Sequence, residues 1–269
     1  MIYDCHLHTC FSGDSDTPVR QQVQRAITLG MEEMCITDHH DYDSCFCEDN
    51  FELDIPAYLP ALRQIQEEYK GSIRINIGIE LGLQNHIAEY LRQFSENYGS
   101  SFDYVIGSSH FVDRTDPYYP EYWESHGEKE GLEKFFQVSL ERVQKLYWAF
   151  DSYGHLDYVV RYAPHGEQYY SYKEYIQWID PLLKVLIQHG KALECNTGAF
   201  KYGMSQPNPC TDILKRYHEL GGELITVGSD AHTPEYIGSG FDRCREMLLA
   251  CGFRYYTVFR GRKACMIPL

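Results

Sequence analysis

The sequence predicts an α/β fold, a single barrel domain that spans residues 1–269. Short β-rich runs alternate with helical patterns along the whole chain, the order of elements expected for a parallel sheet covered by helices. A length of 269 residues is usual for one barrel core, and no Pro/Ser-rich linker or low-complexity tract divides the chain. We therefore expect about seven strand–helix repeats and one final strand.

The expected strands are short runs rich in β-branched and aromatic residues. They are IYDC from residue 2, MCIT from 34, IRINIGI from 73, DYVIGS from 103, LDYVV from 156, ALEC from 192, LITVG from 224 and YYTVF from 255. Helical periodicity is clear in three other segments. Residues 211–222 and 241–252 each carry one apolar face and end in glycine, and residues 129–153 are expected to form one long helix.

Composition restricts the classes of partner. Lys and Arg total 24 and Asp and Glu total 39, so the formal charge of −15 argues against a nucleic-acid partner. No run approaches the roughly 18 apolar residues of a membrane span, and the polar start lacks the pattern of a secretory signal. Several of the ten cysteines lie in apolar runs, while Cys45 and Cys47 have no second pair nearby that would complete a zinc site. We expect reduced thiols in a cytoplasmic protein, and the oligomeric state stays open.

Histidines and acidic residues gather at the C-terminal ends of the expected strands. They are His6 and His8 after the first, His39 after the second, Glu80 after the third, His110 after the fourth, and Asp230 and His232 after TVGS, whereas His155 leads into a strand. Because strand C-termini converge on one face of a barrel, these distant residues become neighbours. His6 and His8 are two residues apart on an extended backbone and so point to the same side, and Asp230 and His232 repeat the spacing. Each pair is suited to gripping a metal ion.

The alternative is that these groups are polar caps of strand ends, each satisfied by backbone hydrogen bonds. That explanation would suffice for one residue. It fails for many imidazoles and carboxylates on one rim, because crowding them together away from water costs free energy unless cations or hydrogen bonds compensate. The joint pattern therefore indicates a metal centre.

The motifs DCHLHTCFSGDS, ITDHHD, GIELG, IGSSHFV, YGHLDYVVRY, ECNTG and GSDAH resemble those of the PHP family, the polymerase and histidinol phosphatase superfamily. They run from residue 4 to residue 232, and the C-terminal run GFRYYTVFRGRKACMIPL resembles the histidinol-phosphate phosphatase branch in particular. The resemblance implies a distorted seven-stranded (β/α) barrel with a trinuclear centre of divalent metal ions.

The resemblance also implies the ligands of each ion. One ion would be held by His6, His8, Glu80 and Asp230, a second by Glu80, His110 and His155, and a third by Asp14, His39 and His232. Imidazole and carboxylate ligands suit zinc, manganese and iron alike. In FSGDSDT, Asp16 is an alternative to Asp14, and either could instead cap a turn.

Two basic residues are candidates for binding a substrate phosphate. By resemblance, Arg161 would fork onto the phosphate, a geometry that Arg provides better than Lys, and a surface salt bridge is its alternative role. Lys201 is either a second phosphate ligand or a solvated loop lysine. Here the chain reads NTGAF where members of the branch commonly read NTSG, so the substrate pocket is expected to differ in detail.

Three further polar residues have open roles. Asp38 and His40, which flank His39, would either orient a ligand or protonate the leaving oxygen, although an extended strand turns both away from His39. Asp157, two residues after His155, either supports that ligand or packs without a catalytic role.

The expected function is metal-dependent hydrolysis of L-histidinol phosphate to L-histidinol and phosphate in histidine biosynthesis, by attack of a metal-bridging hydroxide; substrate and pathway are implied by resemblance alone. One alternative is a PHP phosphoesterase acting on nucleotides or other small phosphate esters, and the low Lys and Arg content weighs against long nucleic acids. The other is a non-enzymatic module in which metal stabilises the fold or is sensed. Such structural sites are coordinatively closed, whereas the expected centre shares Glu80 and needs open positions for water.

Overall fold

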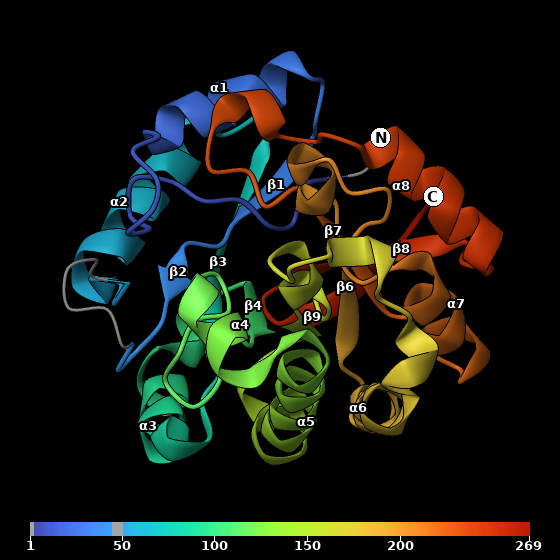
Figure 1. The fold of residues 1–269 in the computed structure, drawn as a ribbon. Coiled ribbons are helices and arrows are strands. Elements are labelled where there is room, and N and C mark those ends of the chain that lie inside the picture. Colours follow the sequence, from blue (N-terminus) through green and yellow to red (C-terminus); the bar gives the residue numbers. More distant parts are fainter. Residues whose placement is uncertain (1–2, 45–50) are drawn as a thin grey trace.

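The computed structural model describes residues 3–44 and 51–269. A parallel sheet of seven strands curls into a distorted barrel, and the helices surround it on the outside (Figure 1). The strands are β1 (Glu33–Ile36), β2 (His39–His40), β3 (Arg74–Gly82), β4 (Tyr104–Ser108), β5 (Ser152–Tyr153), β6 (Ala192–Asn196) and β7 (Ile225–Gly228). The α-helices are α1 (Val19–Thr28), α2 (Ile55–Glu68), α3 (Ala88–Tyr98), α4 (Pro120–His126), α5 (Glu128–Leu146), α6 (Ile176–Gln188), α7 (Thr211–Glu219) and α8 (Phe241–Cys251). The α/β barrel class predicted from the sequence is confirmed.

The N-terminal run closes the barrel without forming a regular strand. The sheet order is β1-β3-β4-β5-β6-β7, with β2 paired to β3, so β1 and β7 are the two edges. Residues 4–8 fill the gap between these edges. On the β7 side Cys5 N–H donates to the Val227 carbonyl (3.0 Å), and on the β1 side Cys35 N–H donates to the Asp4 carbonyl (2.8 Å). The predicted IYDC strand is thus present as a segment of isolated parallel bridges.

The last expected strand does not join the barrel. Strand β8 (Tyr255–Arg260) pairs antiparallel with β9 (Lys263–Pro268) in a separate two-stranded hairpin. Arg260 of this hairpin pairs with Glu33, the first residue of β1, and Gly261 N–H donates to Asp103, just before β4 (2.9 Å). The hairpin therefore lies at the amino-terminal ends of the strands and leaves their carboxyl ends open.

Two predicted elements between β4 and β6 are wrong. The helix expected over 129–153 ends at Leu146, because Asp151 N–H donates to the Val105 carbonyl (2.8 Å) and so draws the chain into the sheet. The predicted LDYVV strand is a 3₁₀ helix over Tyr158–Arg161, and the strand β5 lies before it. His155 accordingly follows its strand, as His110 and Asp230 do, and lies at the same end of the barrel as the other candidate ligands.

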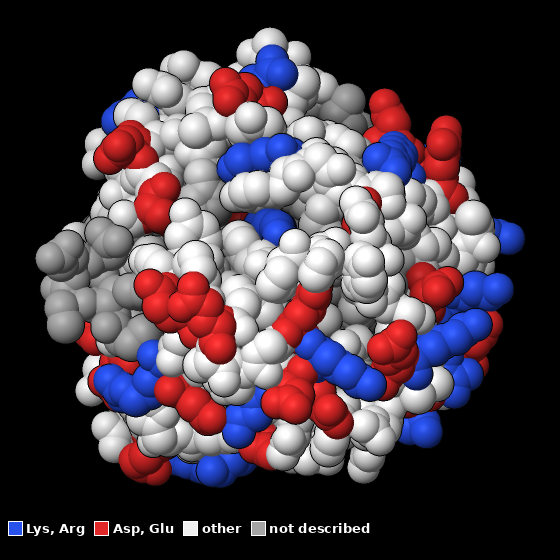
Figure 2. Space-filling view, in the orientation of Figure 1, with Lys and Arg blue, Asp and Glu red and all other residues white. Residues whose placement is uncertain are grey.

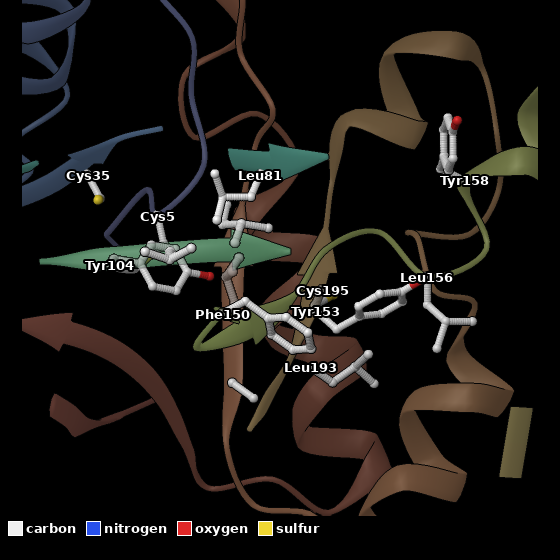
Figure 3. Packing of buried hydrophobic residues seen from close by; sticks show 14 of the residues in the cluster. Cys5, Cys35, Leu81, Tyr104, Phe150, Tyr153, Leu156, Tyr158, Leu193 and Cys195 are labelled. Carbon is white, nitrogen blue, oxygen red and sulfur yellow. The ribbon is translucent and has the colours of Figure 1, made fainter. Parts of the chain in front are cut away.

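Apolar and aromatic side chains are buried on the sheet. Because side chains alternate along a strand, Leu81 and Leu193 point to the opposite face from Glu80 and Glu194, between the sheet and its helices. Figure 3 shows Tyr104, Phe150 and Tyr153 packed with Leu81 and Leu193, and all five are almost fully buried. Rings and branched chains of this size remove a large apolar area from water, which is the main favourable contribution to the stability of the barrel. This packing fixes the strands whose carboxyl ends form the rim of the barrel.

Two expectations from composition concern cysteines and membranes. The cysteines at positions 5, 10, 35, 195, 210, 244, 251 and 265 are free thiols. Cys45 and Cys47 lie outside the described residues. Within the described ranges, none of the helices has the length and apolar character needed to cross a membrane.

Candidate metal centre and active site

The barrel register places the predicted metal ligands on one rim. Glu80 in β3 pairs with His39 of β2 on one side and with Ile106 of β4 on the other. The remaining ligands emerge at the same rim, from the closing segment (His6, His8), from the ends of β4 and β5 (His110, His155) and from the end of β7 (Asp230, His232). The prediction that strand ends bring these residues together is confirmed by their contacts.

The first group of donors forms around His6 and His8. Both rings are fully buried, and their Nε2 atoms face each other at 3.1 Å. Glu80 Oε2 lies 3.1 Å from His6 Nε2, and Asp230 Oδ1 lies 3.2 Å from His8 Nε2. These are the four residues that the motifs assign to one ion.

The second group forms around the other oxygen of Glu80. Glu80 Oε1 lies 2.9 Å from His155 Nε2 and 3.3 Å from His110 Nε2, while Oε2 faces His6. One buried carboxylate thus presents its two oxygens to two sets of imidazoles. This is the arrangement expected of a carboxylate that bridges two metal ions.

The third group lies nearer to solvent. Asp14 Oδ2 is 3.0 Å from His232 Nε2 and 3.7 Å from His39 Nε2. The His8 ring stacks between them, with ring centroids 4.2 Å from those of His39 and His232. These contacts favour Asp14 over Asp16 as the carboxylate of this group.

The electrostatics of the cluster are those of tightly paired opposite charges. Although burial disfavours ionisation, the imidazoles of His6 and His39 hold the pKa of Glu80 well below its usual value. Burial likewise opposes a charged imidazole, yet Glu80 and Asp14 raise the pKa of His39 to about 9. Burial and the neighbouring imidazoles lower the pKa of His8 to about 3. Protons on some imidazoles thus balance the carboxylates, a role that a divalent cation performs equally well.

The donor atoms fit divalent metal ions. Two unprotonated Nε2 atoms at the spacing of His6 and His8 repel each other unless a proton or a cation lies between them. The Nδ1 atom of His155 is buried without a hydrogen-bond partner, and the Nδ1 atom of His39 lies 3.0 Å from Glu80 Oε2. Four overlapping trios within the described residues have donor atoms no more than 4.8 Å apart: His8, His39 and His232; His6, His8 and Glu80; His39, Asp41 and His110; Glu80, His110 and His155. Imidazole and carboxylate donors of this kind bind zinc, manganese or iron.

Three residues that the sequence did not single out orient the ligands. Glu194 Oε1 accepts a hydrogen bond from His6 Nδ1 (2.6 Å), and Asp41 Oδ1 accepts one from His110 Nδ1 (2.8 Å). Ser12 Oγ lies 3.0 Å from His8 Nδ1. Each contact places a proton on Nδ1 or fixes the ring, so that Nε2 turns its lone pair to the centre. For Glu194, the available sequence signal was a carboxylate in the middle of a buried strand.

An open cavity of about 450 Å³ lies over these donors. Two cations, Arg161 and Lys201, line it together with several metal-ligand candidates. Aromatic rings form much of the remaining wall: Phe51, Phe111, Tyr118, Tyr119, Tyr158, Tyr162 and Tyr202. Figure 2 shows a hollow near the centre of the viewed face with Lys and Arg atoms inside and beside it, while acidic groups are scattered over the surrounding surface.

Arg161 and Lys201 differ in how firmly they are held. The Arg161 guanidinium lies over the Tyr202 ring, 4.2 Å from its centroid, and its Nη2 donates to Asn208 Oδ1 (3.3 Å). Lys201 is exposed, with its Nζ 4.8 Å from the centroid of the Tyr236 ring. The arginine is therefore a fixed side chain, whereas the lysine approaches the cavity from its edge.

The side chains of Asp38 and His40 point into the scaffold and do not line the cavity. Asp38 accepts hydrogen bonds from Thr9 N–H (2.6 Å) and from the Ser12 hydroxyl (2.8 Å). His40 Nε2 lies 2.6 Å from the Tyr90 hydroxyl, and its Nδ1 accepts from Leu53 N–H (2.9 Å). These contacts do not support proton transfer to a leaving oxygen by either residue. Their placement follows from the two-residue period of the strand, which turns both away from His39.

A parallel barrel with imidazole and carboxylate donors clustered at its carboxyl rim defines a metal-binding barrel protein. The PHP domain family model matches residues 4–198, which is more than half of the chain. The protein belongs to the PHP domain family. The resemblance noted in the motifs is thereby confirmed.

Known relatives cover nearly the whole chain. It is 31% identical over 261 residues to the histidinol-phosphatase of Lactococcus lactis subsp. lactis (strain IL1403), covering 97% of this chain and 95% of the relative. It is 23% identical over 263 residues to the histidinol-phosphatase of Bacillus subtilis (strain 168), covering 89% and 96%. A crystal structure of histidinol phosphate phosphatase from the same Lactococcus lactis strain, complexed with zinc, L-histidinol and phosphate, matches with a TM-score of 0.89 and 31% identity over 98% of each chain.

Proposed function

We propose that this protein is a metal-dependent phosphomonoesterase that hydrolyses L-histidinol phosphate to L-histidinol and inorganic phosphate. The observation that carries the proposal is the division of the buried Glu80 between two imidazole groups, one of which lines the same cavity as Arg161. The relatives named histidinol-phosphatase support the choice of substrate. We further propose that the centre takes three divalent ions and that the enzyme acts in the cytoplasm.

The chain's own residues would bind the ester and hold it in place. When bound, divalent ions supply positive charge that stabilises the phosphoryl oxygens, and they lower the pKa of water to near neutrality. Arg161 would donate two parallel N–H groups to the phosphate, and Lys201 would add charge from the edge of the cavity. Glu80, His6 and His155 are buried, which would restrict the motion of their donor atoms. Glu80 also accepts from the Ser108 hydroxyl (2.6 Å), and His6 Nδ1 donates to Glu194 (2.6 Å).

The cavity wall suits an alcohol that carries a cation and a flat ring. Asp116 lines the wall, and its Oδ1 accepts a hydrogen bond from Tyr118 N–H (2.8 Å). Among the described residues, no Lys or Arg nitrogen lies within 4.0 Å of this carboxylate. The rings of Tyr118 and Tyr162, with centroids 5.2 Å apart, offer faces for stacking. We therefore propose that Asp116 receives the substrate ammonium and that the tyrosines receive its imidazole.

The test is phosphate release by protein reconstituted with zinc, manganese or iron, from L-histidinol phosphate and from a panel of mononucleotides. Metal-dependent turnover confined to histidinol phosphate is the expected result. Arg161→Ala should remove most of this activity, whereas Arg63→Ala, at an exposed position on α2, should not. Comparable kcat/KM values over the nucleotides would reject the substrate, and absence of turnover with every ester and metal would reject the enzyme.

A further inference from the structure

Asn208 is a buried residue between the cavity and the scaffold, and sequence analysis gave it no role. It is 1% exposed. Its backbone forms an antiparallel bridge to Asn196 at the end of β6, with N–H to carbonyl distances of 2.8 and 2.9 Å. Both hydrogen bonds of this bridge fix the backbone of Asn208, and burial restricts its side chain.

The orientation of the Asn208 amide is set by Asp157. Asn208 Nδ2 donates to Asp157 Oδ1 (2.8 Å), and the second oxygen of Asp157 accepts from Cys210 N–H (3.0 Å). Because a carboxylate accepts and does not donate, the NH₂ group of the amide must face Asp157. The amide oxygen then faces Arg161, whose Nη2 donates to it (3.3 Å). Asp157, Asn208 and Arg161 thus form a chain of hydrogen bonds in which Arg161 donates to Asn208 and Asn208 donates to Asp157.

This chain holds the arginine without neutralising it. Among the described residues, no carboxylate oxygen lies within 4.0 Å of the Arg161 guanidinium. The Asn208 amide separates the negative charge of Asp157 from the guanidinium, and the Tyr202 ring packs against one face of the guanidinium. A carboxylate in direct contact would compete with an anionic ligand for the guanidinium, whereas a neutral amide leaves its positive charge for that ligand.

The same bridge connects the arginine to the metal centre. Asn196 Nδ2 donates to Glu194 Oε2 (3.2 Å), and Glu194 orients His6 through its other oxygen. The backbone bridge between Asn196 and Asn208 therefore fixes the position of Arg161 relative to the strand that supports the metal ligands.

We propose that Asn208 and Asp157 are positioning residues that aim Arg161 at the phosphate group of the substrate. The inference rests on the proposed function, in which Arg161 binds phosphate. It predicts that Asn208 acts through Arg161 alone and contributes nothing once the arginine is removed.

The decisive experiment is a double-mutant cycle with Asn208→Ala, Arg161→Ala and the double variant, all metal-loaded. Two quantities are measured: kcat/KM for L-histidinol phosphate, and the dissociation constant of inorganic phosphate by calorimetry. We expect Asn208→Ala to lower kcat/KM about tenfold and to raise the phosphate dissociation constant about tenfold. This is the usual effect of losing one hydrogen bond to a charged group. The double variant should be no weaker than Arg161→Ala. Asn97→Ala, at an exposed site on α3, is the matched control.

Several outcomes would overturn the proposal. Multiplying losses in the double variant would show that Asn208 acts independently of Arg161. An unchanged phosphate dissociation constant in Asn208→Ala would show that the arginine is already aimed without it. If Asn208→Ala fails to fold, Asp157→Asn replaces it in the cycle, because the new amide removes the carboxylate that fixes the amide direction. Phosphate binding does not depend on the alcohol, so failure to hydrolyse histidinol phosphate would reject the proposed substrate and leave this test intact.

Discussion

Replacing Glu194 by Gln should weaken metal binding, although Glu194 does not line the cavity beside the metal-ligand candidates. Its Oε1 accepts from His6 Nδ1 (2.6 Å), and its Oε2 accepts from the buried N–H of His155 (2.8 Å). A glutamine has one carbonyl oxygen and cannot accept both. With its NH₂ toward His6, the ring must accept at Nδ1, which moves the ring proton to Nε2 and blocks the metal-binding lone pair.

The expected size follows from the burial of this pair. Both side chains are at most 1% exposed, so water cannot replace the lost hydrogen bond. Loss of such a partner of a metal-bound histidine typically lowers metal affinity 10- to 100-fold, or about 1.4–2.7 kcal/mol. The assay is titration of metal-free protein with zinc in the presence of a competing chelator, together with its melting temperature. Glu96→Gln on α3, an exposed carboxamide substitution, is the control.

The number of weakened sites is the sharper readout. The site that contains His6 should lose affinity, while the group of Asp14, His39 and His232 should keep it. Equal zinc affinity at every site in Glu194→Gln and in the unaltered protein would refute the assignment of Glu194 as the residue that orients His6. A uniform loss over all sites, with a lower melting temperature of the metal-free protein, would indicate general damage to the barrel instead.

Three further perturbations test other parts of the site. Asp116→Asn should lower kcat/KM for histidinol phosphate about tenfold while leaving an alkyl phosphate without an amine unaffected, because only the first substrate carries an ammonium group; equal losses would exclude this role. Gly228→Ala would place a Cβ 2.2 Å from the His6 Cβ, so calorimetry should show destabilisation of about 1–3 kcal/mol and zinc titration a loss of affinity, whereas Gly99→Ala, away from the centre, should keep both. Burial opposes a charge on His39, yet carboxylates raise its pKa to about 9. Its charged form therefore stabilises the metal-free protein below pH about 6.5, and this stability is lost as pH rises to about 9. Protons also compete with metal ions for His39. The increase in melting temperature that zinc causes should therefore be larger at pH 9 than at pH 6.5, and an increase that stays constant or becomes smaller would contradict this linkage.

The clustering of the candidate metal ligands was predictable because it depends on two simple geometric rules. Side chains two residues apart on an extended backbone share a side, which pairs His6 with His8 and Asp230 with His232. Parallel strands of a barrel end on one rim, which brings the pairs together. Neither rule requires knowledge of side-chain packing.

The wrong elements lie where tertiary contacts override local pattern. The aromatic and β-branched run at residues 158–160 is buried in a 3₁₀ helix. Burial there stabilises apolar side chains just as burial in a strand would, so composition does not distinguish the two. Residues 147–153 continue the apolar helical spacing of α5, but they form a short 3₁₀ helix over Tyr147–Ala149, and pairing of Ser152 with Ile106 and Ala192 then places the end of the run in the sheet. A periodic apolar pattern indicates that side chains are buried, but it does not indicate which neighbouring element they pack against.

The supporting residues could not be identified from local sequence for the same reason. Glu194 is separated from His6 by 188 positions, and their contact exists only when the N-terminal segment closes the gap between β1 and β7. That segment makes isolated bridges instead of a continuous ladder, so its backbone alone holds it less firmly than a full strand. Its His6 and His8 are also metal-ligand candidates, together with Glu80 in β3 on the β1 side and Asp230 just after β7 on the other. A metal ion bound by these four residues would therefore join the edges of the barrel, and the free energy of metal binding would contribute to its closure.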